Sequence, residues 1–94
     1  MQVKWLRTAA QNLDDETNYL AKENPKIAKA FFSYVVKSVN QLAKFPELGR
    51  PGRVSGTREL VIQRYPYIVP YRIKDNSVEV LRIFHTSRVW PKLL

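Results

Sequence analysis

The residues best suited to chemistry lie in one stretch near the C-terminus, RIFHTSRVWP, which contains the only histidine of the chain. A histidine side chain gains or loses a proton near neutral pH, so His85 could act as a general acid or base. Arg82 and Arg88 could hold a phosphate, because a guanidinium presents several donors in one plane. The stretch therefore fits either a small nuclease site or a surface that binds another macromolecule. A packed histidine is the structural alternative.

A second candidate is the loop LGRPGRVSGTR, residues 48–58, which combines the three glycines of the chain with Arg50, Arg53 and Arg58. A mobile, cationic segment of this kind exposes backbone donors that suit an acidic protein or a nucleic acid phosphate. The loop lacks the lysine and Ser/Thr ending of a nucleotide-binding P-loop, which excludes NTP binding. An ordinary basic linker between a helix and a sheet is the alternative.

Aromatic residues close to these basic ones complete the set of candidates. Tyr65 and Tyr67 flank a proline in a predicted corner, and Trp90 comes near the end of the chain. Their rings could contact a partner, although packing is the simpler role for each of them. The residues predicted to bind a target or a partner protein are Arg50, Arg53, Arg58, Tyr65, Tyr67, Arg72, Arg82, Arg88 and Trp90.

Metal and cofactor chemistry has little support in the sequence. The chain has one histidine and no cysteine, and its carboxylates cluster only in the run DDE, residues 14–16. Zinc sites use nitrogen and sulfur ligands, and calcium sites need several converging oxygens. We therefore predict no metal site, no cofactor and no disulfide.

The charge of the chain points to an anionic partner. The net charge is +8, and residues 50–94 carry nine basic against three acidic side chains, or +6, whereas residues 1–49 carry seven against five, or +2. Seven of those nine basic residues are arginines, which form bidentate contacts with phosphate or carboxylate groups. Nucleic acid and an acidic protein satisfy this pattern equally, and a solvated basic face is the alternative.

The length and the apolar pattern predict one domain over residues 1–94. No apolar run approaches the roughly 20 residues needed to span a bilayer. The N-terminus MQVKWLRTAA lacks the apolar core of a signal peptide. We expect a soluble, cytoplasmic protein.

Two helices follow a short first strand, QVKWL, residues 2–6. From Thr8, a possible N-cap, apolar residues recur every three or four positions and predict an amphipathic helix. Asn24 followed by Pro25 is a strong helix start, a capping residue before a proline at the first helical position. A second helix with an apolar stripe follows and is expected to end near Phe45, because a proline comes next.

Beyond the basic loop, apolar residues recur with a period of two. The segments RELVI (58–62), YIVPYRI (67–73) and VEVLRIF (78–84) predict three strands, joined by the corner RYP (64–66) and the hairpin turn KDNS (74–77). We expect an antiparallel meander with both helices on one face and the first strand at an edge. The predicted fold is α+β, with the order β-α-α-β-β-β.

Neither of the last two predicted strands has a cleanly polar face. Strict alternation places Val78, Val80, Arg82 and Phe84 on one side of the last strand, and Glu79, Leu81, Ile83 and His85 on the other. A sheet covered by helices on one side should be polar on the other, so we expect the second face to meet a partner segment or the C-terminal tail. Pro70 indicates an edge position or a bulge in its strand.

This order of elements resembles the RelE/ParE toxins of bacterial type II toxin–antitoxin modules. The segments WLRTAAQNLDD, FPELGRPGRVSGTREL with YPYIVPYRI, and VEVLRIFHTSRVWP are similar to the opening, the loop with central hairpin, and the closing strand with tail of that family. The resemblance covers essentially the whole chain. It implies a toxin neutralised by a cognate antitoxin that wraps the sheet face and the basic tail in a hetero-oligomer.

The family contains two activities, and the resemblance must be carried over residue by residue. RelE-like members are ribosome-dependent endoribonucleases with basic residues on the central strands and an arginine and a tyrosine near the C-terminus. Here the first central strand offers Arg58 and Glu59 but no lysine, and Ile68 stands where the nuclease pattern has an arginine. Arg88 matches the late arginine, but no tyrosine follows it. The nuclease set is therefore incomplete.

ParE-like members inhibit DNA gyrase, and the segments YPYIVPYRI and HTSRVWP look closer to that branch. The favoured hypothesis is a ParE-like toxin that arrests growth, with a part in plasmid stabilisation. One alternative is a ribosome-dependent mRNA endoribonuclease with His85, Arg88 and Arg82 as catalytic residues. The other is a basic binding module without toxicity.

Overall fold

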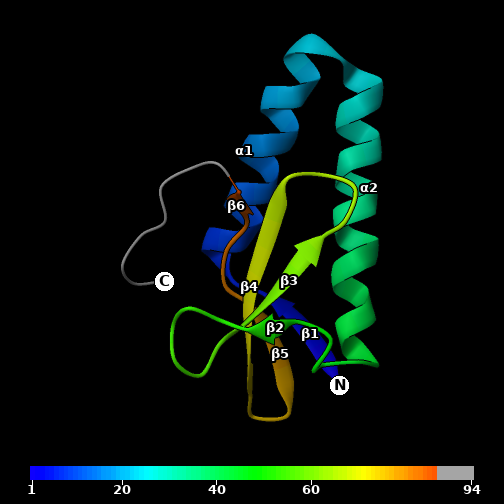
Figure 1. Ribbon diagram of the computed structural model, residues 1–94. Helices are drawn as coiled ribbons and strands as arrows, with labels where there is room; N and C mark the ends of the chain where they lie inside the picture. The colour runs from blue at the N-terminus through cyan, green and yellow to red at the C-terminus, as the bar shows by residue number, and fades with distance from the viewer. Residues whose placement is uncertain (87–94) are drawn as a thin grey trace.

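A computed structural model describes residues 1–86, so Arg88 and Trp90 lie outside the described residues. The elements are β1 (Gln2–Trp5), α1 (Arg7–Glu23), α2 (Pro25–Asn40), the 3-10 turn η1 (Gln41–Ala43), β2 (Arg50–Pro51), β3 (Arg58–Ile62), β4 (Tyr67–Lys74), β5 (Ser77–Val80) and β6 (Phe84–His85). Figure 1 shows α1 and α2 side by side, with their connection at the end of the molecule opposite the β4–β5 hairpin. The predicted α+β fold, with two helices packed on a small, mostly antiparallel sheet, is confirmed.

The start of α2 is the one that the sequence predicted. The Asn24 side chain accepts hydrogen bonds from the backbone N–H groups of Lys26 (3.1 Å) and Ile27 (3.2 Å), and Pro25 occupies the first helical turn. These bonds satisfy donors that the first turn of a helix leaves without partners. The helix ends at Asn40 and passes into η1, a few residues before the predicted end.

The prediction that Thr8 caps α1 was wrong. The helix begins at Arg7, and its N-cap, Leu6, makes no side-chain capping bond. The Leu6 N–H donates to the Val80 carbonyl (3.1 Å), and its carbonyl accepts from the Ala10 N–H (3.0 Å). The chain therefore passes from the sheet into the helix at one residue and leaves no room for a separate cap.

The sheet has the order β1-β5-β4-β3-β2, and β6 also pairs with β4. The predicted meander of β3, β4 and β5 is antiparallel, and β1 joins its edge as expected, in parallel with β5. Asp75 and Asn76 have φ angles of 51° and 59°, which is the conformation of a two-residue type I′ hairpin. The short strand β2 lies in the predicted loop and was not foreseen.

The last predicted strand is interrupted by a bulge. β5 pairs with β4 as far as Val80, which lies opposite Tyr71, and β6 resumes the pairing at Phe84, opposite Ile68. Two residues of β4 therefore face three in the other segment, residues 81–83. This extra residue is a β-bulge, which reverses the sides on which the following residues point.

Pro70 accounts for the position of the bulge. It has no N–H to give to a neighbouring strand, and its carbonyl accepts from the Leu81 N–H (2.9 Å) at the start of the interruption. β4 is paired on both sides, so of the two predicted explanations for Pro70 the bulge is correct and the edge position is wrong.

The core lies between the helices and one face of the sheet. Its fully buried side chains include Phe31, Val35 and Val39 of α2 and Val69 and Tyr71 of β4. Both helices present a stripe of apolar residues to this face, which removes that stripe from water. Within residues 1–86, neither α1 nor α2 combines the length and the apolar character that crossing a membrane requires.

Candidate functional site

The bulge decides where the candidate catalytic residues lie. His85 pairs with Tyr67, whose side chain belongs to the core beneath the helices. Phe84 pairs with Ile68 on the opposite face of the sheet, which the helices do not cover and which we call the open face. The predicted alternation, which placed Arg82 and Phe84 on the same side as the core residue Val80, was therefore wrong, because the extra residue shifts the pattern by one position.

His85 lies in a polar corner on the helix side of the sheet. Its ring contacts the Tyr67 ring edge to face, with ring centres 5.2 Å apart and an angle of 81°. The Tyr67 hydroxyl donates to Glu16 Oε2 of α1 at 2.9 Å. All three side chains line a cavity of about 270 Å³, which the exposed Tyr19 and Ile27 also border. This arrangement fits the packing role for His85.

Arg82 lies on the open face. Its guanidinium is 5.7 Å from the centre of the Phe84 ring, a cation–π contact. Because Phe84 and His85 point to opposite faces of the sheet, Arg82 and His85 do not converge on one site. The structure separates two of the three residues that a nuclease mechanism would require together.

Arg72 is held on the same open face by Glu79. The two residues are directly opposite in the β4–β5 pair, and Arg72 Nε lies 2.6 Å from Glu79 Oε1. Lys4 of β1 comes next in the same row, opposite Glu79. The hydrogen bond from Arg72 holds the pKa of the Glu79 carboxyl below its usual range, so this pair remains charged at neutral pH.

We expect an NMR titration to detect this pair directly. In the wild-type protein the Glu79 pKa should lie below that of an ordinary glutamate, and Arg72→Gln should raise it. Because the folded-state pKa is depressed, the pair stabilises the fold above the unfolded-state pKa, and this contribution is lost as the pH falls through the folded-state pKa. A Glu79 pKa that is unchanged in Arg72→Gln would show that the arginine does not set it.

Glu59 organises the basic loop from the open face. Only 3% of its side chain is exposed, and it accepts bonds from Arg50 Nε (3.2 Å) and Arg50 Nη2 (3.1 Å). Its second oxygen accepts the backbone N–H of Arg53 at 3.0 Å, and the Arg53 side chain lies 4.0 Å away. The two arginine side chains are about half exposed, so they still present charge to solvent.

Tyr71 and Arg58 anchor the other end of the loop. The Tyr71 hydroxyl donates to the Pro46 carbonyl (2.7 Å) and accepts the Gly49 N–H (2.8 Å). Burial raises the pKa of Tyr71, which keeps the phenol protonated as a donor. Arg58 Nη1 donates to the Gly49 carbonyl at 2.8 Å, so this predicted binding residue makes a contact within the protein. A side chain at Gly49 would collide with the Tyr71 ring.

Tyr65 lies at the corner between β3 and β4 and belongs to an aromatic cluster. Its ring contacts Phe31 at 5.3 Å and Tyr34 at 5.6 Å, both edge to face. The guanidinium of Arg64 lies 5.8 Å from the Tyr65 ring centre. The rings of Tyr65 and Tyr67 are therefore packed within the protein, which is the simpler role that the sequence indicated. Arg64 lies beside this cluster at the surface.

The carboxylates that orient the arginines were the main residues that sequence reasoning missed. Glu59 and Glu79 lie on the open face, each beside an arginine of a neighbouring strand. The sequence contains a signal for the Arg72–Glu79 pair, because a two-residue turn at 75–76 places these two positions opposite each other. The Arg50–Glu59 pair had none, since nothing local predicts β2.

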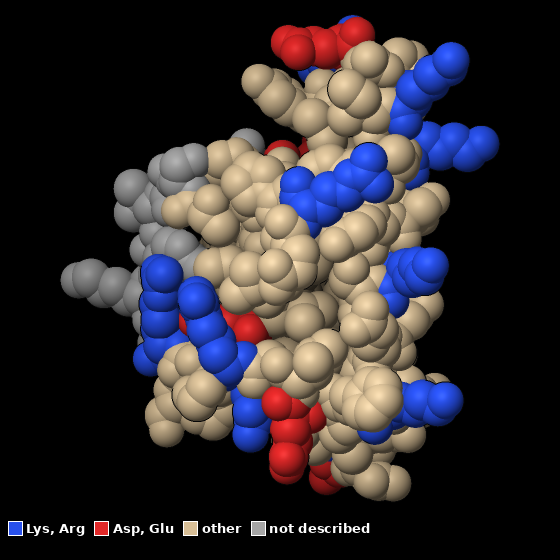
Figure 2. All heavy atoms as spheres, turned by 45° about the vertical axis from the view of Figure 1, so that its right-hand side comes forward, with Lys and Arg blue, Asp and Glu red and all other residues tan. Residues whose placement is uncertain are grey.

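Basic side chains are spread over one face of the molecule and outnumber the acidic ones there (Figure 2). Figure 2 shows them over the full height of one face, with a group at the lower left that adjoins acidic side chains. Lys26, Lys29 and Lys37 are exposed on α2. Among residues 1–86 there is no group of three or more histidines, cysteines or carboxylates placed to hold a metal ion.

Comparison with known proteins assigns these features to one family. A family model for the ParE toxin of type II toxin–antitoxin systems of the parDE kind matches residues 3–90. The chain is 39% identical over 93 residues to the candidate toxin Y4kP of Sinorhizobium fredii (strain NBRC 101917 / NGR234), covering 99% of this chain and 96% of that one. It is 31% identical over 88 residues to toxin RelE2 of Caulobacter vibrioides, covering 94% and 98%.

Solved structures agree with this similarity. The fold superposes on a chain of the chromosomal ParDE toxin–antitoxin system from P. aeruginosa with a TM-score of 0.83 and 32% identity, covering 93% of this chain and 97% of that one. A chain of the toxin–antitoxin complex RelBE2 from Mycobacterium tuberculosis superposes with a TM-score of 0.58 and 30% identity, covering 89% and 95%.

Proposed function

Since the chain belongs to the ParE toxin family of type II toxin–antitoxin systems, we propose that it arrests growth in the cytoplasm by inhibiting DNA gyrase. A cognate antitoxin neutralises it within a hetero-oligomer. Both solved relatives are described as toxin–antitoxin assemblies, which supports a partner of this kind.

The observation that carries this proposal is the separation of His85 from Arg72 and Arg82. Cleavage of RNA by its 2′-hydroxyl needs an acid, a base and cations around a single phosphate. His85 lies on the helix side of the sheet, whereas both arginines lie on the open face. An inhibitor needs no such convergence, because it acts by binding.

The open face suits such binding because its arginines are already oriented. Glu79 fixes Arg72, and Glu59 fixes Arg50, each through charged hydrogen bonds. A side chain that is ordered before binding loses less conformational entropy when the partner arrives. The remaining exposed area of these guanidiniums can meet carboxylates on an acidic protein surface.

A ribosome-dependent mRNA endoribonuclease is the second candidate function. The 31% identity to toxin RelE2 favours it, and so does the contact of His85 with the Glu16–Tyr67 pair at a cavity. In that mechanism His85 would act as the acid or the base and Arg88 would contact the phosphate.

Parallel assays on purified toxin freed of antitoxin distinguish the two candidates. We expect gyrase supercoiling to be blocked and mRNA on translating ribosomes to remain intact. Arg82→Gln should raise the half-inhibitory concentration by about tenfold, which corresponds to about 1.4 kcal/mol of lost binding. Lys29→Gln, a charge change on exposed α2, is the matched control and should leave inhibition unchanged.

The opposite result would support the endoribonuclease. Codon-positioned cuts in mRNA with gyrase unaffected would refute gyrase inhibition. Loss of those cuts in His85→Gln, at unchanged melting temperature, would then assign His85 to the reaction.

A further inference from the structure

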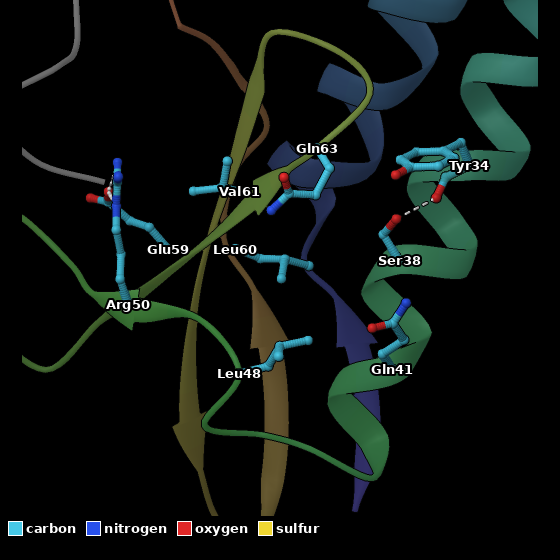
Figure 3. Close-up of a pocket in the computed structure, with 9 residues that line it drawn as sticks. All are labelled: Tyr34, Ser38, Gln41, Leu48, Arg50, Glu59, Leu60, Val61 and Gln63. Atoms are coloured by element: carbon cyan, nitrogen blue, oxygen red, sulfur yellow. Dashed lines mark hydrogen bonds and ion pairs between the residues drawn. The ribbon is translucent and has the colours of Figure 1, made fainter.

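A carboxylate and a guanidinium meet at the wall of one cavity of this protein. Figure 3 shows this cavity of about 360 Å³ between β3 and α2, with Arg50 and Glu59 at its edge. The Arg50 guanidinium lies 3.1 Å from Glu59 Oε1. Guanidinium and carboxylate groups match in shape as well as in charge. The same complementarity applies to the carboxylate of the cavity beside His85.

Glu16 is the carboxylate of that second cavity, the one of about 270 Å³ that Tyr67 and His85 border. Only 8% of Glu16 is exposed, whereas Asp14 and Asp15 on the same helix are exposed. The Tyr67 hydroxyl donates to Glu16 Oε2 (2.9 Å), which fixes the carboxylate at the wall. A charge that is removed from water is costly unless an opposite charge lies beside it. The cavity therefore favours a cationic group over a neutral or an anionic one.

The rest of the wall suits an organic cation. It includes two apolar and two aromatic side chains, Leu20, Ile27, Tyr19 and Tyr65. The ring of Tyr65 accepts a guanidinium on its other contacts, because that of Arg64 lies 5.8 Å from the ring centre. A guanidinium is flat and more weakly hydrated than an ammonium, so it enters such an environment more readily.

The cavity is open to solvent and has no ligand set for a metal. Tyr19 and Ile27 at its rim are 61% and 47% exposed. Calcium and magnesium need several oxygens that converge on one point. Residues 1–86 hold no group of three or more side chains that could ligate a metal ion, so Glu16 suits a larger, singly charged group. Apolar walls with one well-placed charge are typical of small-ligand sites.

We propose that this cavity binds an alkylguanidinium group, with its guanidinium on Glu16 and its alkyl stem against Leu20 and Ile27. The bound group holds α1 against the corner between β3 and β4, since both contribute to the wall. This binding does not depend on gyrase inhibition, because the cavity lies on the helix side of the sheet, away from the open face.

Two sources can supply this group, a free small molecule and Arg88 of the same chain. The Thr86 N–H donates to the carbonyl of Pro66 (2.8 Å), a residue of the cavity wall. Arg88 follows two residues later, and two residues span at most about 7 Å. An arginine of the same chain has a high effective concentration at the cavity, so it would compete with a free compound.

The test is a titration with N-ethylguanidinium, followed through the NMR signals of His85, the only histidine of the chain. N-ethylurea, which has nearly the same shape but no charge, is the control ligand. We expect saturable shifts with N-ethylguanidinium and none with N-ethylurea, in the wild type or, if Arg88 competes, in Arg88→Gln. Glu16→Gln keeps an acceptor for Tyr67 but loses the charge, and in the same background it should weaken binding by about tenfold or more. Asp14→Asn, the same loss of charge on the exposed side of α1, should leave binding unchanged.

Each outcome supports or overturns the proposal. Equal binding by the wild type and Arg88→Gln would assign the cavity to a free guanidinium compound, and binding about tenfold or more tighter in Arg88→Gln would assign it to the arginine of the chain. Equal shifts with both ligands, unchanged affinity in Glu16→Gln, or no shift in either wild type or Arg88→Gln would overturn the site. If Glu16→Gln does not fold, the comparison of the two ligands decides by itself.

Discussion

Phe31→Ala should lower the free energy of unfolding by about 3–5 kcal/mol, the usual cost of emptying a buried aromatic site. Phe31 is fully buried on α2, and its ring packs against Tyr65 (5.3 Å) and Tyr67 (4.9 Å). It thereby joins the helix to the corner of the sheet next to His85. Domains of this size are stable by only about 5–15 kcal/mol, so this loss is a large part of the total stability and should lower the melting temperature markedly.

Phe32→Ala is the matched control, because this neighbouring phenylalanine is 40% exposed. Its cost should stay below about 1 kcal/mol, as expected for a surface position. Urea unfolding of both variants measures the difference. Equal losses would mean that α2 does not present the Phe31 face to the sheet.

Glu59→Leu should release the basic loop. The substitution removes the acceptor of the Arg53 N–H and both bonds from Arg50. We expect a loss of about 1–3 kcal/mol, the cost of leaving a buried polar group without its partner. The loss should not be larger, because the half-exposed arginine side chains can be hydrated instead.

Limited trypsin digestion provides a local measurement of the same change. Cleavage after Arg53 should become faster by about tenfold for each 1.4 kcal/mol by which loop opening becomes easier. Glu79→Leu removes a more exposed carboxylate and should leave this cleavage rate unchanged. A Glu59→Leu protein that resists trypsin as well as the wild type would show that Tyr71 and Arg58 hold the loop by themselves.

Local sequence signals were sufficient for several elements. Asn24 and Pro25 fixed the start of α2, since a cap and a first-turn proline act on the residues that directly follow them. The turn residues Asp75 and Asn76 tolerate positive φ, so the β4–β5 hairpin was predicted from local sequence. The basic, arginine-rich second half followed from composition.

Only the tertiary structure decided where the candidate site residues point. The bulge at residues 81–83 arises because Pro70 of a neighbouring strand offers no N–H, a constraint that the last strand cannot contain in its own sequence. That one extra residue sends His85 to the helix side and Arg82 to the open face. Likewise, Glu59 and Arg50 meet because two segments pair across the sheet. Sequence patterns show how residues alternate within one strand, whereas the face that a side chain occupies also depends on how that strand pairs with the strand beside it.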